Sequence, residues 1–183
     1  MRTHAPLQAR SADTVTGETD RGELEIIPFR PEFKSDVLGL IVGIQRDEFG
    51  IEITAEQQPD LHDIPAFYQK RGGNFWLAVV DGRVVGTISL LDIGNNQGAL
   101  RKMFVHPEFR GSERRTAKRL LETLLDWARD RQVREIFLGT TSKFLAAHRF
   151  YAGNGFSEVP RSALPSAFPI MTVDTRFFHR RVE

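Results

Sequence analysis

Residues 103–117 read MFVHPEFRGSERRTA, and they decide the fold because several structural signals follow one another here without interruption. The apolar residues 103–105 are typical of a strand, and His106-Pro107 stops it. A short loop with Gly111 follows, and a basic helix begins near Arg114. A helix start exposes unpaired backbone N–H groups and the positive end of the helix dipole. The stretch therefore predicts a strand, a loop and an anion site at the first turn of a helix.

The segments around this stretch predict the rest of a mixed sheet. Residues 99–105 complete the strand, 114–131 form a helix with one apolar stripe, and 133–139 form the next strand. Because a helix separates these two strands, we expect them to be parallel neighbours. Further strands are predicted over 24–29, 75–80 and 83–91, and further helices over 35–49 and 60–70, with Ser35 as a helix cap and Asp81-Gly82 as a hairpin turn.

The C-terminal part predicts one more helix and a closing strand. Ser142 is the expected cap of a helix through Tyr151, and Asn154-Gly155 is the expected stop. Residues 172–178 are the expected closing strand. The fold class is therefore α+β, with a mixed, mostly antiparallel central sheet of about six to seven strands flanked by about four helices. We expect a single domain over 21–183 behind a disordered N-terminal leader, residues 1–20.

Charge is distributed unevenly along the chain. The 183 residues carry a formal charge of only +1, which argues against a nucleic-acid partner. Residues 101–119, however, hold seven basic and two acidic side chains, so this stretch carries +5 and the rest of the chain −4. We interpret the basic stretch as a site for an anion.

Several classes of site and location are excluded or disfavoured by composition. The absence of cysteine excludes disulfides, thiolate zinc sites and cysteine nucleophiles. The five histidines have no metal-binding spacing, so no metal site is expected. No apolar run is long enough to cross a bilayer, and the first 20 residues lack the apolar region of a secretory signal. We expect a cytoplasmic protein with no membrane partner.

A second chemically informative segment is residues 139–156, GTTSKFLAAHRFYAGNGF. Ala147 and Tyr151 are four apart and share one helical face. Tyr151 is one of two tyrosines in a chain with 14 phenylalanines, so its hydroxyl is a candidate for a role that packing alone would not require. The alternative is a core tyrosine with a satisfied hydroxyl.

Together these two segments resemble the GNAT superfamily of N-acetyltransferases, in element order over about 23–180 and in motifs over about 99–156. In that family a strand ending V-x-P-x-x, here Val105 to Phe109, leads to an R/Q-x-x-G-x-G/A loop. Downstream, the family's A-x-x-F/L-Y-x-x-x-G-F signature is met in full; its residues here are Ala147, Phe150, Tyr151, Gly155 and Phe156. The fold this implies is GNAT-like.

The loop departs from the family pattern. Counted directly from Arg110, the positions for small residues are Glu113 and Arg115; in a loop two residues longer, they are Arg115 and Ala117. We favour the longer loop, because it leaves one misfit and that misfit is cationic. Phe144 stands where the family often has asparagine.

The resemblance implies direct acetyl transfer from acetyl-CoA, as co-substrate, to a primary amine of a small molecule or peptide. Tyr151 would be the catalytic acid that protonates the leaving thiolate. The expected cofactor-binding residues are Met103, Phe104, Val105, Arg110, Gly111, Ser112, Arg114, Arg115, Thr116, Ala117, Phe144 and Tyr151. A homodimer is compatible with this interpretation. The alternative function is a catalytically silent CoA-binding or regulatory module with the same fold.

The base and the acceptor stay open at the level of sequence. Glu52, Glu56 and Asp92 are candidate bases, His148 is interpreted as a helix-surface residue, and His106 as part of the strand stop. The region 45–74 is mildly acidic, which is compatible with a cationic amine acceptor; its charged residues are Asp47, Glu48, Glu52, Glu56, Asp60 and Asp63 against Arg46, Lys70 and Arg71.

Overall fold

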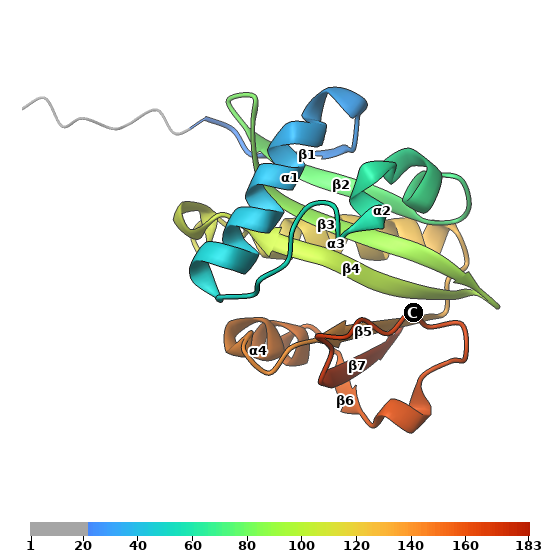
Figure 1. Ribbon diagram of the computed structural model, residues 1–183. Coiled ribbons are helices and arrows are strands. Elements are labelled where there is room, and N and C mark those ends of the chain that lie inside the picture. The colour runs from blue at the N-terminus through green and yellow to red at the C-terminus, as the bar shows by residue number, and fades with distance from the viewer. Residues whose placement is uncertain (1–21) are drawn as a thin grey trace, which may run out of the picture.

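The computed structural model describes residues 22–183, so the leader expected over 1–20 lies outside the described residues. Seven strands form one sheet in the order β1-β2-β3-β4-β5-β7-β6 (Figure 1). The strands are β1 Glu25–Pro28, β2 Asn74–Val80, β3 Arg83–Gly94, β4 Gln97–Val105, β5 Glu135–Thr140, β6 Ser157–Val159 and β7 Arg176–Arg181. Only β4 and β5 pair in parallel, so the expected mixed, mostly antiparallel sheet is confirmed.

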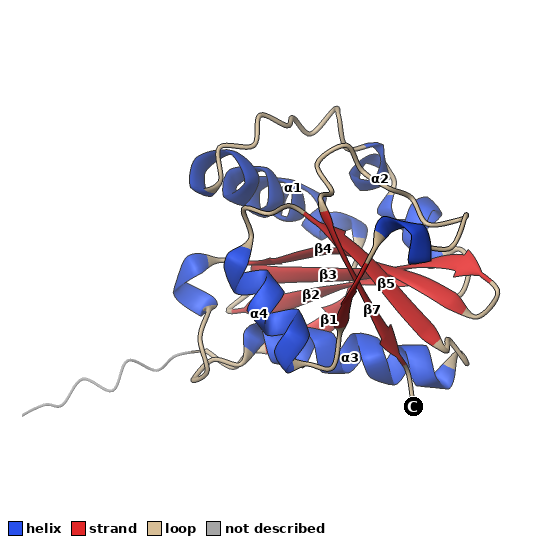
Figure 2. Ribbon diagram, turned by 90° about the horizontal axis from the view of Figure 1, so that it is seen from below, coloured by secondary structure: helices blue, strands red, loops and turns tan. Residues whose placement is uncertain are grey.

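Helices cover both faces of the sheet (Figure 2). The α-helices are α1 Lys34–Gly43, α2 Pro59–His62, α3 Thr116–Asp130 and α4 Leu145–Gly153. Along β2, Phe75, Leu77 and Val79 pack into a core with α1 and α2, while Trp76, Ala78 and Val80 pack into a core with α3 and α4. Because alternate side chains of a strand point to opposite faces, β2 must be apolar throughout. This arrangement accounts for the unbroken apolar run that predicted the strand.

The parallel strands β4 and β5 separate along their length. They are paired only at residues 97–99 of β4 and 135–137 of β5. From Leu100 to Val105, the ladder partners of β4 lie on β3 alone. The sheet therefore opens into a wedge between the two strands, and this wedge determines where cavities form.

Several helix boundaries differ from the sequence predictions. Neither Ser35 nor Ser142 caps a helix, because α1 begins after Phe33 and α4 after Phe144, both without a side-chain cap. The helix expected over 60–70 is two short pieces, α2 and a π-helical turn Pro65–Gln69, because a proline has no N–H to continue a helix.

Two further differences concern α3 and the sheet edge. Helix α3 begins at Thr116 and not near Arg114, because Arg115 has left-handed backbone geometry, with φ +53°. The sequence patterns did not predict β6, which has only three residues. In the part of the chain that the structure describes, no helix is both long and apolar enough to span a bilayer.

Candidate active site

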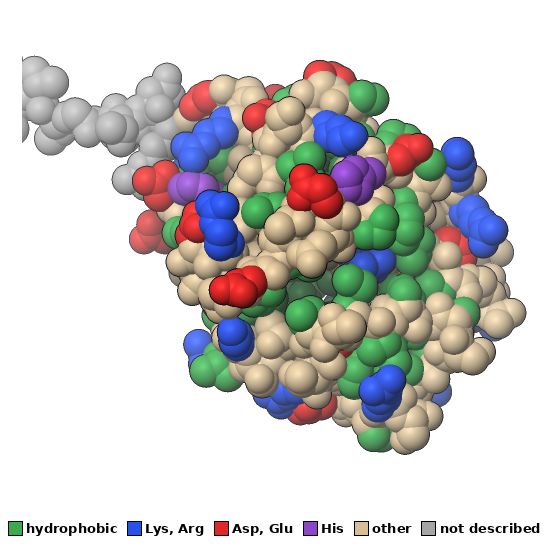
Figure 3. Space-filling model, viewed as in Figure 1, with side chains coloured by type: hydrophobic (Ala, Val, Ile, Leu, Met, Phe, Trp, Pro, Cys, Tyr) green, Lys and Arg blue, Asp and Glu red, His purple; other side chains and the backbone are tan. Residues whose placement is uncertain are grey.

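Two connected cavities fill the wedge between β4 and β5. The loop-side groove, which faces the 106–117 loop, has a volume of about 490 Å³. The second cavity, here named the Arg101 pocket, lies toward α2 and the 168–174 loop. Five residues line both: Met103, Phe104, Phe144, Ala147 and Tyr151. Figure 3 shows the hollow in this face, rimmed largely by hydrophobic side chains. The shared residues mark the point where ligands entering from the two sides would meet.

The loop-side groove collects seven of the twelve residues that the sequence assigned to cofactor binding: Met103, Phe104, Val105, Arg110, Ala117, Phe144 and Tyr151. The other five, namely Gly111, Ser112, Arg114, Arg115 and Thr116, lie in the adjoining loop and first turn of α3 without lining this groove. The groove thus runs along the open edge of β4 toward the start of α3.

The first turn of α3 has the features of an anion site. The carbonyl of Arg115 accepts the first helical bond, from Arg119 N at 2.8 Å. The N–H groups of residues 116–118 therefore have no partner within the helix. Within the described chain, the Thr116 hydroxyl is also buried without a hydrogen-bond partner. Four donors thus gather at the positive end of a helix dipole.

The backbone of the loop supports the longer of the two loop alignments. Arg115 has φ +53°, in the left-handed region that glycine favours. This is the position where the longer alignment expects a glycine, and Ala117, the second expected small residue, lines the groove. An arginine therefore adopts here the backbone geometry that glycine favours.

Arg110 is held away from the helix start. Its Nε donates to the Val105 carbonyl at 2.8 Å, and its two terminal nitrogens bind the Glu48 carboxylate at 2.5 and 2.7 Å. Glu48 ends the π-helical segment Ile44–Glu48 that follows α1. Nearby, the Lys143 ammonium donates to the Phe49 carbonyl at 3.2 Å. These contacts connect the segment after α1 to both walls of the groove.

Tyr151 lies at the junction of the two cavities. Its ring packs against Phe156 and Phe178 at centroid distances of 5.7 and 6.0 Å, and the residue is 5% exposed. Among the described residues, none forms a hydrogen bond with its hydroxyl, and burial raises the pKa of that hydroxyl. A neutral, unpaired hydroxyl facing a cavity can donate a proton or a hydrogen bond to a ligand.

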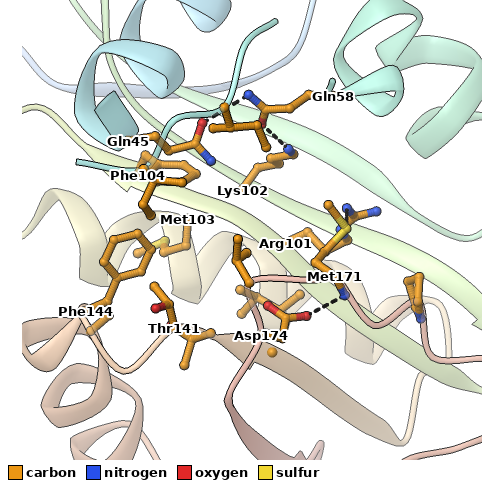
Figure 4. Close-up of a pocket in the computed structure, with 18 of the residues that line it drawn as sticks. Gln45, Gln58, Arg101, Lys102, Met103, Phe104, Thr141, Phe144, Met171 and Asp174 are labelled. Carbon is orange, nitrogen blue, oxygen red and sulfur yellow. Dashed lines mark hydrogen bonds between the residues drawn. The ribbon is translucent and has the colours of Figure 1, made fainter. Parts of the chain in front are cut away.

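The Arg101 pocket has charged side chains of β4 on one wall (Figure 4). The Lys102 ammonium donates to Gln58 Oε1 at 2.6 Å and lies 3.4 Å from the buried Asp60 carboxylate. Arg101 lies 3.7 Å from the same carboxylate, which also accepts a 2.5 Å hydrogen bond from Tyr68. One carboxylate thus faces two cations, and this wall of the pocket carries one positive charge in excess.

A β-bulge places both cations on one side of β4. Lys102 has φ +52°, and the pairing of β3 with β4 shifts between Thr87 and Ser89. The Thr87 and Ser89 hydroxyls donate to the carbonyls of Lys102 and Arg101 at 2.7 and 2.9 Å. A bulge lets consecutive side chains point the same way, which regular alternation does not allow. Sequence reasoning missed these two residues for that reason.

Burial changes the acid–base properties of Lys102. It lowers the pKa of the ammonium to about 8, although the adjacent Asp60 carboxylate raises it. The ammonium is therefore mainly charged at neutral pH and loses its charge in the mildly basic range. The excess positive charge of the wall that Arg101 and Lys102 form therefore depends on pH.

None of the base candidates taken from the sequence lies in this pocket. Glu52 and Glu56 are exposed, and the Asp92 carboxylate accepts bonds from Gly72 N and Gly94 N. Other titratable groups do line it: Arg101, Lys102, Tyr151 and Asp174. The sequence carried no motif for Asp174, which stands in an irregular loop.

The two histidines near the motifs have structural roles. His148, expected on the helix surface, is buried, and its ring bonds the Thr141 carbonyl at 3.0 Å and Arg176 at 2.9 Å. His106 ends β4 as expected and accepts a hydrogen bond from Glu108 N. No cluster of side chains suited to a metal ion occurs among residues 22–183.

Comparison with known proteins gives close relatives in sequence and structure. N-acetylaspartate synthetase of Xenopus tropicalis is 38% identical over 104 residues, which cover 55% of this chain and 37% of that protein. The Homo sapiens N-acetylaspartate synthetase is 33% identical over 69% of this chain and 42% of its own length. The matched region therefore covers less than half of either N-acetylaspartate synthetase.

Solved structures cover the whole fold. An acetyltransferase of the GNAT family from Staphylococcus aureus is 39% identical, with a TM-score of 0.85 over 88% of this chain and 100% of that one. A Thermoplasma acidophilum PaiA N-acetyltransferase in complex with coenzyme A shares the fold at 16% identity, with a TM-score of 0.68 over 87% of this chain and 99% of that one. The family model described as acetyltransferase (GNAT) family matches residues 40–156, and the chain belongs to this acyltransferase family.

Proposed function

We propose that this protein is an acetyl-CoA-dependent N-acetyltransferase that moves an acetyl group directly to the primary amine of a small amino acid. The observation that carries the proposal is the opened wedge, with the unpaired Tyr151 hydroxyl between the loop-side groove and the Arg101 pocket. Each cavity takes one substrate, and the reacting atoms meet beside Tyr151.

The loop-side groove suits coenzyme A. Its diphosphate needs hydrogen-bond donors and positive charge, which the free N–H groups of residues 116–118, the buried Thr116 hydroxyl, Arg114 and Arg115 supply. Its pantetheine arm needs a strand edge, which residues 103–105 of β4 offer. The coenzyme A bound in the Thermoplasma acidophilum protein supports the same ligand class here.

Three features of the chain support direct transfer. The chain has no cysteine to form a thioester intermediate. The backbone of residues 103–105, which has no ladder partner on β5, can polarise the thioester carbonyl. The Tyr151 hydroxyl can protonate the departing thiolate, because it is protonated at neutral pH; burial raises its pKa further above the ordinary value of 10.

The wall of the Arg101 pocket that carries Arg101 and Lys102 favours an acceptor with a carboxylate. The composition of residues 45–74 had suggested a cationic acceptor instead. Most acidic residues of that region are exposed, and the buried Asp60 is already engaged by Arg101 and Lys102. The excess positive charge that remains on this wall attracts a carboxylate. The name of the relatives, N-acetylaspartate synthetase, supports an amino acid with a side-chain carboxylate.

A two-step experiment tests the proposal. Thermal stabilisation by acetyl-CoA and CoA is measured first, followed by thiol release with aspartate, glutamate, lysine, polyamines, aminoglycosides and a lysine peptide. We expect stabilisation by both nucleotides and release mainly with the acidic amino acids. Stabilisation without release for any amine would instead support a catalytically silent CoA-binding module, which the arginine at the glycine position of the loop leaves as the second candidate.

A further inference from the structure

Asp174 occupies a prepared position on the wall of the Arg101 pocket opposite Arg101 and Lys102. Its carboxylate accepts a 2.9 Å hydrogen bond from Met171 N, and its own N–H donates to the Met171 carbonyl at 3.0 Å, which closes a tight turn. The next residue, Thr175, bonds Thr140 of β5 at 2.9 Å. The carboxylate is therefore fixed to the sheet although it belongs to a loop.

Gly139 makes this position available. A Cβ atom at Gly139 would lie 2.4 Å from Asp174 Oδ2, so any other residue would displace the carboxylate. The φ angle of Gly139 is not positive, so its backbone geometry does not require a glycine. Steric room for Asp174 is thus the local requirement that a glycine meets here.

Asp174 is the one carboxylate among the described residues that line the pocket. No ion pair joins it to Arg101 in the described chain, so both groups can contact a ligand. The Arg101 charge faces it from β4, and the Tyr151 hydroxyl lines the same cavity from α4. On its outer side lie Arg161 and the paired side chains Glu158 and Arg176 of β6 and β7.

Burial raises the pKa of Asp174, while the Met171 N–H and the Arg101 charge lower it. A carboxylate with a raised pKa is a better proton acceptor near neutral pH than an exposed one. Opposite walls of the pocket thus offer a carboxylate and two cations, the complement of an amino acid with a side-chain carboxylate (Figure 4).

Building on the proposed function, we propose that Asp174 binds the ammonium group of the acidic amino acid and acts as the general base that deprotonates it, while Arg101 and Lys102 hold its carboxylates. The ammonium gives one proton to Asp174. The neutral amine attacks the thioester carbonyl carbon, so the C–N bond forms as the C–S bond breaks. Tyr151 gives its proton to the thiolate and regains one from the amide nitrogen, and Asp174 releases its proton to water.

The test uses the full chain with acetyl-CoA and aspartate, and compares wild type with Asp174→Asn over pH 6 to 10. We expect kcat/KM for aspartate to fall by about 100-fold or more at neutral pH. The defect should shrink as pH rises, because more of the amine is then already neutral. Succinate, which has both carboxylates and no amine, should inhibit both proteins within about threefold of one another.

Two further variants complete the design. Asp126→Asn makes the same change on the exposed face of α3, where the side chain contacts Arg129, and should behave as wild type. Gly139→Ala keeps the carboxylate but displaces it, and should reproduce the loss for aspartate. If Asp174→Asn gains no thermal stability from CoA, that variant is misfolded. Gly139→Ala then tests the role of the Asp174 carboxylate in its place.

The outcomes separate the two proposals. Aspartate turnover by Asp174→Asn within threefold of wild type, or a defect that is equal at every pH, overturns the role of Asp174 and leaves the acetyltransferase proposal standing. If wild type itself releases no thiol with any amine, the proposed function is overturned, and the role of Asp174 with it.

Discussion

The two cavities of the wedge are built from the sequence in different ways. The loop-side groove draws on two segments, 103–117 and 143–151, together with the end of the segment after α1. The Arg101 pocket draws on four separated segments, 45–58, 100–104, 139–151 and 168–174. Most residues of the groove belong to two sequence motifs, whereas the residues of the pocket come from segments that are far apart in the sequence. Sequence motifs therefore indicated the residues of the loop-side groove, whereas those of the Arg101 pocket could be identified only from the fold.

The difference extends to the forces in the two cavities. The groove offers the backbone donors of the first turn of α3, a largely apolar lining and charged side chains along its rim, which suit one constant ligand. The pocket offers fixed charges, Asp174 on one wall and Arg101 with Lys102 on the other. Charge placement discriminates among acceptors, because a mismatched polar group left buried costs about 1–3 kcal/mol.

The largest expected effect on turnover is that of Tyr151, at the junction of the two cavities. Tyr151→Phe should lower kcat by about 100- to 10,000-fold, because the thiolate then leaves without a proton donor. The dissociation constant for CoA and the thermal stability should stay the same, since no described residue bonds this hydroxyl. Steady-state kinetics at saturating substrates measures the effect. Unchanged turnover would remove Tyr151 from the mechanism.

Next in size is the charge of the Arg101 pocket. Lys102→Met should raise KM for aspartate by about 10- to 100-fold at pH 7, because the excess cation is lost. In wild type, KM should rise as pH passes about 8, where Lys102 loses its proton. The variant should show no such rise, and KM for acetyl-CoA should be unaffected. An equal pH dependence in both proteins would assign the effect to another group.

The same lysine should also affect stability. Its pKa of about 8 in the folded chain lies below the ordinary value of 10.5, so between these values the unfolded chain binds more protons. The free energy of unfolding of wild type relative to Lys102→Met should therefore increase with pH over that range. Urea unfolding at pH 7.5, 9 and 10 measures the difference. A difference that falls with pH would contradict the assignment.

A smaller effect is expected at the start of α3. Thr116→Val replaces a buried hydroxyl without a partner in the described chain, and should stabilise the unliganded protein by about 1 kcal/mol. It should also weaken CoA binding by about five- to tenfold, because one donor to the diphosphate is lost. Calorimetry measures both. Thr123→Val is the matched control, since that hydroxyl bonds the Arg119 carbonyl on the exposed face.

The smallest effect concerns the contact between Glu48 and Arg110. Glu48→Gln should free the arginine to approach the diphosphate and tighten CoA binding by about two- to fivefold. Stability should fall by less than about 1 kcal/mol, because the pair is partly exposed. Glu52→Gln, an exposed neighbour, is the control for removing a charge. Weaker CoA binding by Glu48→Gln would mean that the pair orders the loop.

Prediction from sequence succeeded where local signals and contacts agree. Asp81-Gly82 fixed the hairpin of β2 and β3, and Gly155, with φ +81°, ends α4 beside Asn154. It failed where tertiary contacts override local preference. Ser142 does not cap α4, and its N–H is instead bonded to the Thr175 hydroxyl at 2.9 Å, a contact 33 residues away in sequence.

The amino-acid sequence alone was sufficient to predict six of the seven strands, the family resemblance and Tyr151, whose side chain lies between the two cavities. These follow from periodicity, turn residues and two short motifs, all of which act over a few neighbouring residues. The charged residues of the Arg101 pocket, by contrast, are brought together only by the tertiary structure. The bulge at Lys102 turned two consecutive side chains to one wall, and Gly139 gave room to a carboxylate 35 positions later in the numbering. Side chains brought together by strand pairing and loop closure leave no local pattern, so their charges had to be located in space.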